Sequence, residues 1–488
     1  MKTKKNRRAA ALLTALVLVA ALLGGCSSDG KAKLNPKNPV TVTVWHYYNG
    51  AVLEAFDALM RTFNETVGMK KGIIVESYGY GSVSELEKAV IASANKEIGS
   101  AEGPNVFASY ADTAYEAEKK GILADLGDYF TQSEQEEYMP SYIDEGKIGL
   151  NGELRIFPVA KSTELFMLND TDWTPFAEAN DLGYDNLSTL EGLVEVARLY
   201  YEWTDALTPD VSDDGKAFYG RDSMANMFII GSMEFGEEIF QVENGKGRIN
   251  VNREVMRKLW DTYYVPYVNG YFSSYGRYRS DDVKVGELLA YIGSTSSAEF
   301  FPSEVTLENG DTYSVTAKIL PTPHFEGANK VLVQQGAGMV VTKSTPTLEL
   351  ASVEFLKWFT DVDNNIAFSA LSGYLPVKKQ AVDYEFMSEK LKRNGQSVSV
   401  ITDETLRIAL GEMKVSALYT NKAFGGGAGA RTVLGNSLQD KAVADREAVE
   451  RLIKNGVGHD EAVARFATDE AFGAWVSDLT ARLESAVE

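Results

Sequence analysis

The sequence is poor in the side chains that bind transition metals and form disulfides. Its 488 residues contain one cysteine, so no disulfide forms within the chain. The three histidines, His46, His324 and His459, lie far apart and show no HxxxH spacing. A zinc site of the usual kind gathers three or four cysteine, histidine or carboxylate ligands. We therefore expect neither a metal nor a cofactor.

Positive charge is also scarce. The chain has 48 lysines and arginines against 69 aspartates and glutamates, which gives a formal net charge of −21 at pH 7. Nucleic-acid binding depends on lysine and arginine side chains that contact phosphates, and no basic run occurs after residue 8, so we expect no nucleic-acid partner. An acidic balance favours solubility. Hydrophobic residues make up 44% of the chain, which is enough for a folded core, and we expect a monomer.

The single cysteine, Cys26, lies between two unlike segments. Residues 2–8 hold five basic side chains, and residues 9–23 form an apolar run shorter than the roughly 20 residues that span a bilayer. A basic start, a short apolar run and small residues at the cut are typical of a secretory signal. The polar segment 26–38 has no apolar period and predicts a flexible tether. A thiol between these segments is poorly placed for burial in a core or for catalysis.

The stretch LLGGC, residues 22–26, resembles the lipobox of bacterial lipoproteins. The resemblance implies a signal peptide over residues 1–25, cleavage before Cys26 and a lipid on the Cys26 sulfur. Two or more lipid chains anchor a protein firmly, at roughly 0.8 kcal/mol per buried CH₂ group. We therefore expect a protein anchored to the extracellular face of a bacterial cytoplasmic membrane. The acidic chain and its tether suit a Gram-positive surface.

The body of the chain alternates between strand and helix patterns. Val40, Val42 and Val44 alternate with threonines, which predicts a strand, and residues 52–63 place apolar side chains at helical spacing. A second strand pattern follows at residues 72–81, and a third at 105–110. Such alternation is typical of an α/β fold with parallel strands.

Loops rich in hydroxyl, glycine and aromatic residues follow several predicted strands. In an open α/β sheet, ligands bind in the crevice where such loops gather. Hydroxyls and backbone amides can hydrogen-bond a neutral polar ligand, and aromatic faces can stack on a sugar. Ordinary turns also favour glycine and serine, so each loop alone is ambiguous. The candidate loops are residues 45–50, 80–84, 160–164, 293–297, 334–339 and 372–376.

Four other patterns allow more than one interpretation. Glu164 and Asp170 have the chemistry of a glycosidase acid/base pair, which needs two carboxyls at roughly 5–10 Å, but carboxylates are abundant in this chain. The run GGGAGAR lacks the strand and acidic residue of a dinucleotide-binding loop and predicts a linker or a loop close to a ligand. Arg431 ends this run as an anion-binding candidate or a surface ion pair. The tyrosine-rich stretch 263–279 is either a stacking wall or a half-exposed packing loop.

Several segments resemble the family 1 extracellular solute-binding proteins, which feed bacterial ATP-driven importers. They are VTVWHYYNG, EKKGILADLGDYF, FPVAKSTELFMLND, AKILPTPHFEG and ASVEFLKWFTDVDNNIAFSALSGYLPVKKQAV, and they extend over nearly all of the chain after residue 40. The resemblance implies a two-lobed periplasmic-binding-protein-like fold of type II, with crossings near 158–166, 290–294 and 340–345. Lobe one would hold residues 39–160 and 294–342, and lobe two residues 165–290 and 345–488.

A partial likeness within this family is to binders of glycerol-3-phosphate and glycerophosphodiesters. It places Tyr374, Gly336, Arg431 and the serines of 294–297 at ligand-contacting positions, and AKSTE matches a Ser-Thr segment. The chain departs from that group at Val83-Ser84, where the group has a Tyr-Glu pair, and at 224–228, where the group has tryptophans. The phosphate-binding arginine could thus be kept while the rest of the pocket differs, or the ligand could be an oligosaccharide.

The resemblance implies a receptor without catalysis that delivers a carbohydrate or glycerophosphate-type solute to the permease of an ABC importer. The alternatives are a lipid-anchored glycosidase and a surface adhesin. The expected ligand-binding residues are Trp45, His46, Tyr47, Ser82, Ser84, Ser162, Thr163, Glu164, Ser294, Thr295, Gly336, Tyr374 and Arg431.

Overall fold

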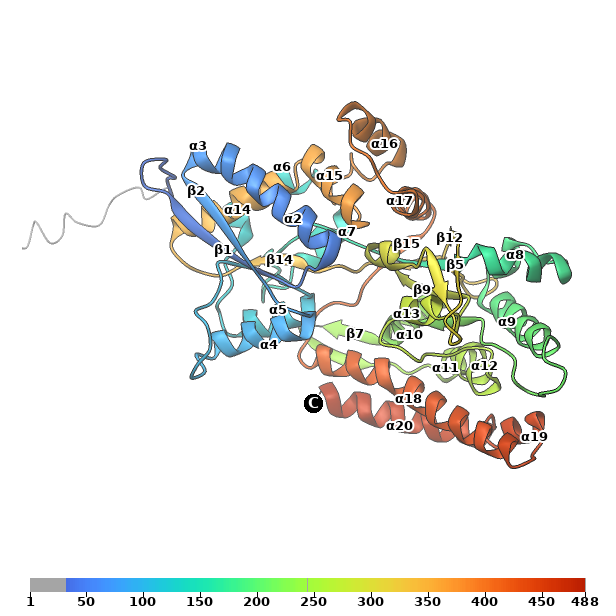
Figure 1. Ribbon diagram of the computed structural model, residues 1–488. Helices are drawn as coiled ribbons and strands as arrows, with labels where there is room; N and C mark the ends of the chain where they lie inside the picture. The colour runs from blue at the N-terminus through green and yellow to red at the C-terminus, as the bar shows by residue number, and fades with distance from the viewer. Residues whose placement is uncertain (1–31, 244, 488) are drawn as a thin grey trace, which may run out of the picture.

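The computed structural model describes residues 32–243 and 245–487. The expected signal peptide, Cys26 and residues 26–31 of the tether lie outside the described residues. The rest of the chain forms two α/β lobes, each built around its own sheet, with long C-terminal helices beneath the second lobe (Figure 1). The α/β, two-lobed fold expected from the sequence is confirmed. Within the described residues, no helix is both long and apolar enough to span a bilayer.

The first sheet has the order β2-β1-β3-β14-β4. Its members are β1 (Val40–His46), β2 (Ile73–Gly79), β3 (Val106–Ser109), β4 (Ile156–Phe157) and β14 (Gly338–Val341). As the alternation predicted, β1 pairs in parallel with both β2 and β3. Strand β14, from far along the chain, pairs antiparallel with β3 and β4 and so completes this sheet.

Helices from two distant parts of the chain cover the first sheet. They are α2 (Gly50–Phe63), which continues through η1 (Asn64–Gly68) and α3 (Met69–Lys71), then α4 (Val83–Ala94), α5 (Ala111–Lys119), α6 (Gln132–Gln135), α7 (Pro140–Gly146), α14 (Pro346–Phe359) and α15 (Val362–Ser372). Phe56 of α2 packs against Phe355 and Phe359 of α14 in the core of this lobe. The family resemblance implied that residues 345 onward belong to lobe two. For α14 this is wrong, because its apolar face packs in the core of lobe one. Helix α15 lies between two cores: Phe368 packs in that of lobe one, whereas Ile366 and Ala370 pack in a core that adjoins the second sheet.

The second sheet has the order β12-β5-β9-β6. It consists of β5 (Glu164–Asn169), β6 (Tyr219–Arg221), β9 (Ala290–Ser294) and β12 (Ala317–Leu320). The family resemblance implied that residues 294–342 belong to lobe one. The structure corrects this for residues 294–320, because the chain after β9 forms η5 (Thr295–Phe300) and the hairpin β10 (Glu304–Thr306) and β11 (Thr312–Ser314), and then returns as β12 to pair antiparallel with β5. Strand β14, at the end of the predicted range, does lie in the sheet of lobe one.

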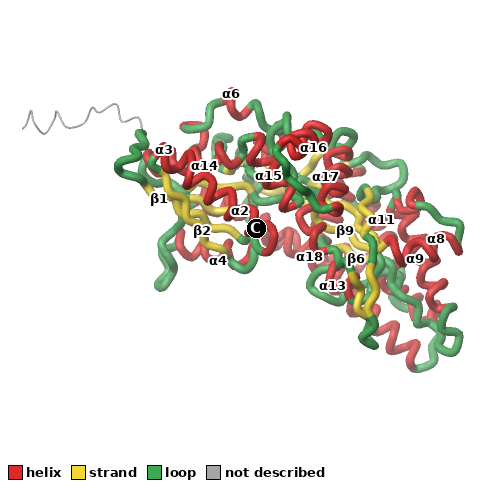
Figure 2. The backbone as a smooth tube through the Cα atoms, turned by 45° about the horizontal axis from the view of Figure 1, so that its top comes forward, coloured by secondary structure: helices red, strands yellow, loops and turns green. Residues whose placement is uncertain are grey.

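Both faces of the second sheet are covered, as Figure 2 shows by the red helices around the yellow strands. Phe166 and Leu168 of β5 face the larger core, whereas Leu165 and Met167 face a smaller one. The apolar run of β5 therefore fits a strand buried on both sides. The larger core is covered by α8 (Asp170–Ala179), α9 (Leu190–Asp205), α10 (Met224–Glu234), α11 (Arg253–Leu259), η4 (Trp260–Tyr264), α12 (Val265–Asn269), α18 (Gly427–Lys454), α19 (His459–Ala464) and α20 (Asp469–Val487), and the smaller one by α13 (Arg279–Lys284), α16 (Tyr384–Arg393) and α17 (Val400–Glu412).

The tyrosine-rich stretch 263–279 is mainly a packing element. Tyr263 and Tyr264 are at most 1% exposed and belong to the core of lobe two, where Tyr264 stacks on Trp260 at a centroid distance of 3.7 Å. The interpretation of this stretch as packing residues therefore agrees with the structure better than its interpretation as a stacking wall. The prediction of a half-exposed loop is wrong for residues 263–269, which continue a buried helix through η4 and α12.

In the part of the chain that the structure describes, three crossing segments connect the lobes, at residues 158–163, 334–337 and 373–377. Lys161 exchanges backbone hydrogen bonds with Leu375, and Ser162 does so with Gln335, so the first segment joins the other two. The crossing predicted near 158–166 is present. The one predicted near 290–294 is wrong, because β9 lies within the second sheet, and the one predicted near 340–345 lies earlier, before β14.

Candidate functional site

A cavity of about 470 Å³ lies between the lobes, beside the crossing segments. Lobe one contributes residues of α4, α5 and α7, and lobe two contributes residues of α10 and α18. We call it the Arg431 cavity. Its polar lining residues are Glu87, Tyr110, Asp112, Thr113, Glu145, Ser223, Gln334, Gln335, Thr420, Asn421, Arg431 and Thr432.

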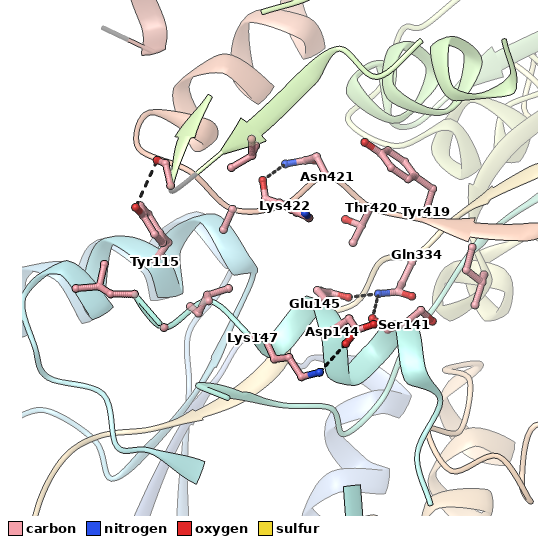
Figure 3. A pocket seen from close by; sticks show the side chains of 17 residues that line it. Tyr115, Ser141, Asp144, Glu145, Lys147, Gln334, Tyr419, Thr420, Asn421 and Lys422 are labelled. Carbon is pink, nitrogen blue, oxygen red and sulfur yellow. Dashed lines mark hydrogen bonds and ion pairs between the residues drawn. The ribbon is translucent and has the colours of Figure 1, made fainter. Parts of the chain in front are cut away.

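A second cavity, of about 650 Å³, adjoins the first and shares Glu145, Gln334, Thr420 and Asn421 with it. We call it the Tyr115 cavity. Figure 3 shows α7 on one side of it and the segment 419–422 on the other. That segment follows β15 (Ala417–Tyr419), which pairs with β13 (Val331–Val333). The Tyr115 hydroxyl lies 3.4 Å from the carbonyl of Gly245, between the hairpin strands β7 (Phe240–Glu243) and β8 (Lys246–Ile249), so a lobe-one residue contacts lobe two here.

A buried ion pair forms part of the wall shared by the two cavities. Lys161, on the first crossing segment, donates to both oxygens of Glu145 at 2.8 and 2.7 Å and to the carbonyl of Gly336 at 2.8 Å. The two charged side chains are 2% and 8% exposed. Gln334 donates to the same carboxylate, while its own Oε1 is enclosed without a hydrogen-bond partner among the described residues. The crossing segments are thus fixed to α7 by charge as well as by backbone pairing.

Arg431 extends from the first turns of α18 into the Arg431 cavity. Its Nη2 donates to Oδ1 of Asn226 on α10, and it forms no ion pair within 4 Å among the described residues. Asn226 is 1% exposed and donates to Glu164 at 2.6 Å and to Gln335 at 3.0 Å. A neutral amide therefore holds the guanidinium and leaves its charge uncompensated by direct contact. The interpretation as a surface ion pair is wrong.

Glu164 is a structural carboxylate. Its Oε2 accepts from Arg221 at 2.5 Å, and its Oε1 accepts from Asn226. Both charged side chains are 5% exposed, which makes this a buried ion pair. The predicted ligand role of Glu164 is therefore corrected: both of its oxygens already have partners within the protein. Its suggested glycosidase partner, Asp170, instead accepts from the Tyr184 hydroxyl at 2.5 Å at the start of α8.

Three tyrosines lie close together next to the Arg431 cavity. Burial raises the pKa of Tyr47, and the neighbouring tyrosines raise it further. Burial also raises the pKa of Tyr374, although its hydrogen bond with Tyr47 opposes this shift. Burial also raises the pKa of Tyr110 to about 12, although the Arg431 guanidinium opposes this shift. All three hydroxyls are therefore neutral at physiological pH, where each can donate and accept a hydrogen bond. Tyr47 and Tyr374 were expected from the sequence, and Tyr110 was missed.

Two expected aromatic residues pack in the core of lobe one. Trp45 is 5% exposed and contacts Tyr80. His46 is 1% exposed, stacks on Tyr48 and accepts the Tyr48 backbone N–H on Nδ1 at 3.2 Å. Burial lowers the pKa of His46. The prediction that these side chains line a ligand site finds no support in their positions.

The expected hydroxyl residues lie in three places. Ser82 caps α4 by accepting the Glu85 N–H at 3.2 Å, and Ser84 is exposed on the same helix. Ser162 and Thr163 are buried on the first crossing segment, and Ser294 and Thr295 lie at the end of β9. The hydroxyls of Thr163 and Thr295 are enclosed without partners among the described residues. Of all the residues expected from the sequence to bind ligand, Arg431 alone lines either cavity.

Sequence reasoning missed Tyr110, Asp112, Asn226 and Gln335. Tyr110 and Asp112 follow β3, so the strand-end rule used for the other loops would have found them. Gln335 precedes Gly336 in a loop that was considered, but its side chain was not singled out. Asn226 lies inside an apolar helix, and nothing local indicates its role.

Comparison with known proteins identifies the family. Residues 58–396 match the family model described as bacterial extracellular solute-binding protein. The chain belongs to this family. No curated protein sequence matches it.

Solved structures of solute-binding proteins share the fold at low sequence identity. UgpB from Mycobacterium tuberculosis in complex with glycerophosphocholine is 18% identical, with a TM-score of 0.65 over 92% of this chain and 100% of that one. The cyclic α-maltosyl-1,6-maltose binding protein from Arthrobacter globiformis is 19% identical, with a TM-score of 0.62 over 90% and 100%. The maltotriose-binding protein from Thermus thermophilus, bound with maltotriose, is 18% identical, with a TM-score of 0.59 over 92% and 100%.

Proposed function

We propose that this extracellular solute-binding protein is a lipid-anchored receptor that delivers a carbohydrate or glycerophosphate-type solute to the permease of an ABC importer. The lipid on Cys26 would hold it at the outer face of a Gram-positive cytoplasmic membrane. The observation that carries the proposal is the Arg431 cavity, where polar side chains from both lobes meet beside three crossing segments.

The lining of the cavity suits a polar, hydroxyl-rich solute. Tyr110 and Gln335 offer neutral donors and acceptors, and Arg431 offers charged donors. The cavity is within the usual range of small-molecule sites, roughly 300–1,000 Å³. Closure of two lobes about a hinge can bury such a solute between them. The structural neighbours are described as binding maltose-type sugars in two cases and glycerophosphocholine in another, and both chemistries are candidates here.

Thermal unfolding of residues 27–488 with millimolar solutes tests the proposal. One panel holds glycerol-3-phosphate and glycerophosphodiesters, and the other holds neutral oligosaccharides. A ligand at 1,000 times its Kd stabilises the folded state by about 4 kcal/mol, which raises the midpoint by several degrees. We expect a rise with one panel, and its loss in the double variant Tyr374→Ala, Arg431→Ala. Wild-type binding by this variant would refute the site.

Because the proposed receptor is not an enzyme, we expect no turnover of glycosides. We expect no product from chromogenic glycosides, and Glu164→Gln should alter stability, because it breaks the buried pair with Arg221. Glycoside hydrolysis by the purified protein, lost in Glu164→Gln, would instead support the glycosidase.

A further inference from the structure

Asp112 faces the Arg431 cavity from lobe one without a hydrogen-bond partner on its inner oxygen. It lies in the first turn of α5, and its Oδ1 is enclosed and unpartnered among the described residues. This oxygen packs against Gly427 of α18, where a Cβ atom on residue 427 would come within 2.6 Å of it. The glycine run before Arg431 therefore has a structural reason: it allows a carboxylate of one lobe to approach a helix of the other.

Arg431 lies one helical turn after Gly427, so both residues lie on the side of α18 that meets α5. The Arg431 guanidinium acts on Asp112 electrostatically, yet no ion pair within 4 Å joins them. Asn226 holds the guanidinium on the lobe-two side of the cavity. The two opposite charges thus line one cavity without direct contact, one on each lobe.

A group placed between these charges must accept from the guanidinium and donate to the carboxylate. A hydroxyl does both, and two adjacent hydroxyls can serve the two residues together. A phosphate only accepts, and its charge would face Asp112 together with Glu87 and Glu145 of the same cavity. The arrangement therefore favours hydroxyls over an anion.

We propose that Asp112 and Arg431 together bind a vicinal diol of the solute, with Asp112 accepting from it and Arg431 donating to it. This inference rests on the proposed function. Sugars and the glycerol end of a glycerophosphodiester both carry such a diol. Titration with one ligand of each class shows which of the two supplies the diol. In this arrangement, Arg431 donates hydrogen bonds to hydroxyl groups of the solute and does not bind a phosphate.

Calorimetric titration of residues 27–488 tests the pair, with maltotriose and glycerophosphocholine as diol probes and phosphocholine as the probe that lacks the glycerol diol. We expect binding of at least one diol probe and none of phosphocholine. Asp112→Asn and Arg431→Gln should each weaken Kd at least tenfold, and the double variant should lose less than the product of the two single effects. Glu116→Gln, one turn further along α5, is the matched control and should keep the wild-type Kd.

The pH profile gives a second test that needs no variant to fold. Burial raises the pKa of Asp112 to about 6, the Arg431 guanidinium opposes this, and Glu87, Glu145 and Glu116 add to it. A diol that donates to the carboxylate stabilises its charged form, so the bound pKa is lower than the free one. Affinity should therefore be full above pH 6 and fall as the pH drops below it.

Each contrary result overturns the pair in its own way. A wild-type Kd in Asp112→Asn, or tighter phosphodiester binding by this variant, would show that Asp112 only packs against α18 or repels an anion. A flat pH profile would do the same. Binding of a solute without a diol would leave the receptor standing and refute the pair. A protein that binds nothing in the thermal panels would refute the proposed function itself.

Discussion

At the residue scale, this molecule holds several charged side chains near the cavities between its lobes, most of them buried, and gives each one defined partners. Lys161 is held by Glu145, Glu164 is held by Arg221 and Asn226, and Arg431 is held by Asn226. A buried pair adds little net stability, but loss of one partner leaves an uncompensated charge. These contacts therefore fix geometry around the cleft more than they raise stability.

The pair of Lys161 and Glu145 gives a stability prediction. Lys161→Met leaves Glu145 buried beside Gln334 without its cation, and we expect a loss of about 3–5 kcal/mol in the free energy of unfolding. The double variant Lys161→Met, Glu145→Leu should recover part of this loss. Urea denaturation measures both. A loss below about 1 kcal/mol in the single variant would mean that water reaches the carboxylate.

Glu234, on α10, gives a pH prediction. It is 4% exposed and accepts the Phe325 N–H at 2.9 Å, and burial raises its pKa to about 8 from the ordinary 4.5. The folded state thus keeps a proton that the unfolded state releases, so stability from this group declines as pH rises from about 4.5 to about 8. Glu234→Gln removes this decline. The free energies of unfolding of the two proteins should diverge over that range, with the variant favoured at higher pH.

At the scale of elements, the crossing segments depend on close backbone approach. Gly336 has φ +94°, and a Cβ atom there would lie 3.0 Å from the carbonyl oxygen of Ala160. The site thus requires glycine for two reasons, conformation and space. The side chains that meet at the cleft come from α5, α10 and α18, whose positions depend on how these segments join the two sheets.

A comparison of Gly336→Ala with Gly327→Ala separates the effect of backbone conformation from the effect of limited space. Gly327 also has a positive φ, +73°, but a Cβ atom there meets nothing within 4 Å. Both variants carry the backbone strain, so the difference between their midpoints of chemical unfolding reports the contact with Ala160. We expect Gly336→Ala to lose about 1 kcal/mol or more beyond Gly327→Ala. Equal losses would show that the first crossing segment yields to the added methyl group.

At the scale of the whole molecule, three segments join the two lobes, and under the proposed function a bound solute changes how closely the lobes approach. Contacts already link the lobes away from the crossings: Tyr115 lies against the β7–β8 hairpin, and Asp112 lies against α18. A solute that binds residues of both lobes favours the state in which they approach.

Small-angle scattering tests this motion. A solute that raises the unfolding midpoint should also lower the radius of gyration of residues 27–488, and Arg431→Ala should abolish both effects at the same solute concentration. The unliganded radius of the variant serves as its control. A midpoint rise without compaction would mean that the solute binds one lobe or a surface that does not change between states.

The sequence by itself determined what local patterns can carry. Alternating valines and threonines predicted β1, and helical spacing predicted α2. Segment similarity over most of the chain indicated the two-lobed family. These signals are local or statistical, so they can be recognised in the sequence without knowing which distant residues are in contact.

Only the tertiary structure decided which partners each side chain has. Glu164 looked available because its cation, Arg221, lies 57 positions away and reaches it only through the pairing of β6 and β5 with β9. The assignment of β12 and α14 to lobes failed because sheet pairing and core packing join segments far apart in sequence. Asp112 and Arg431 meet at one cavity for the same reason. Hydrogen bonds and burial depend on three-dimensional proximity, which residue spacing along the chain does not encode.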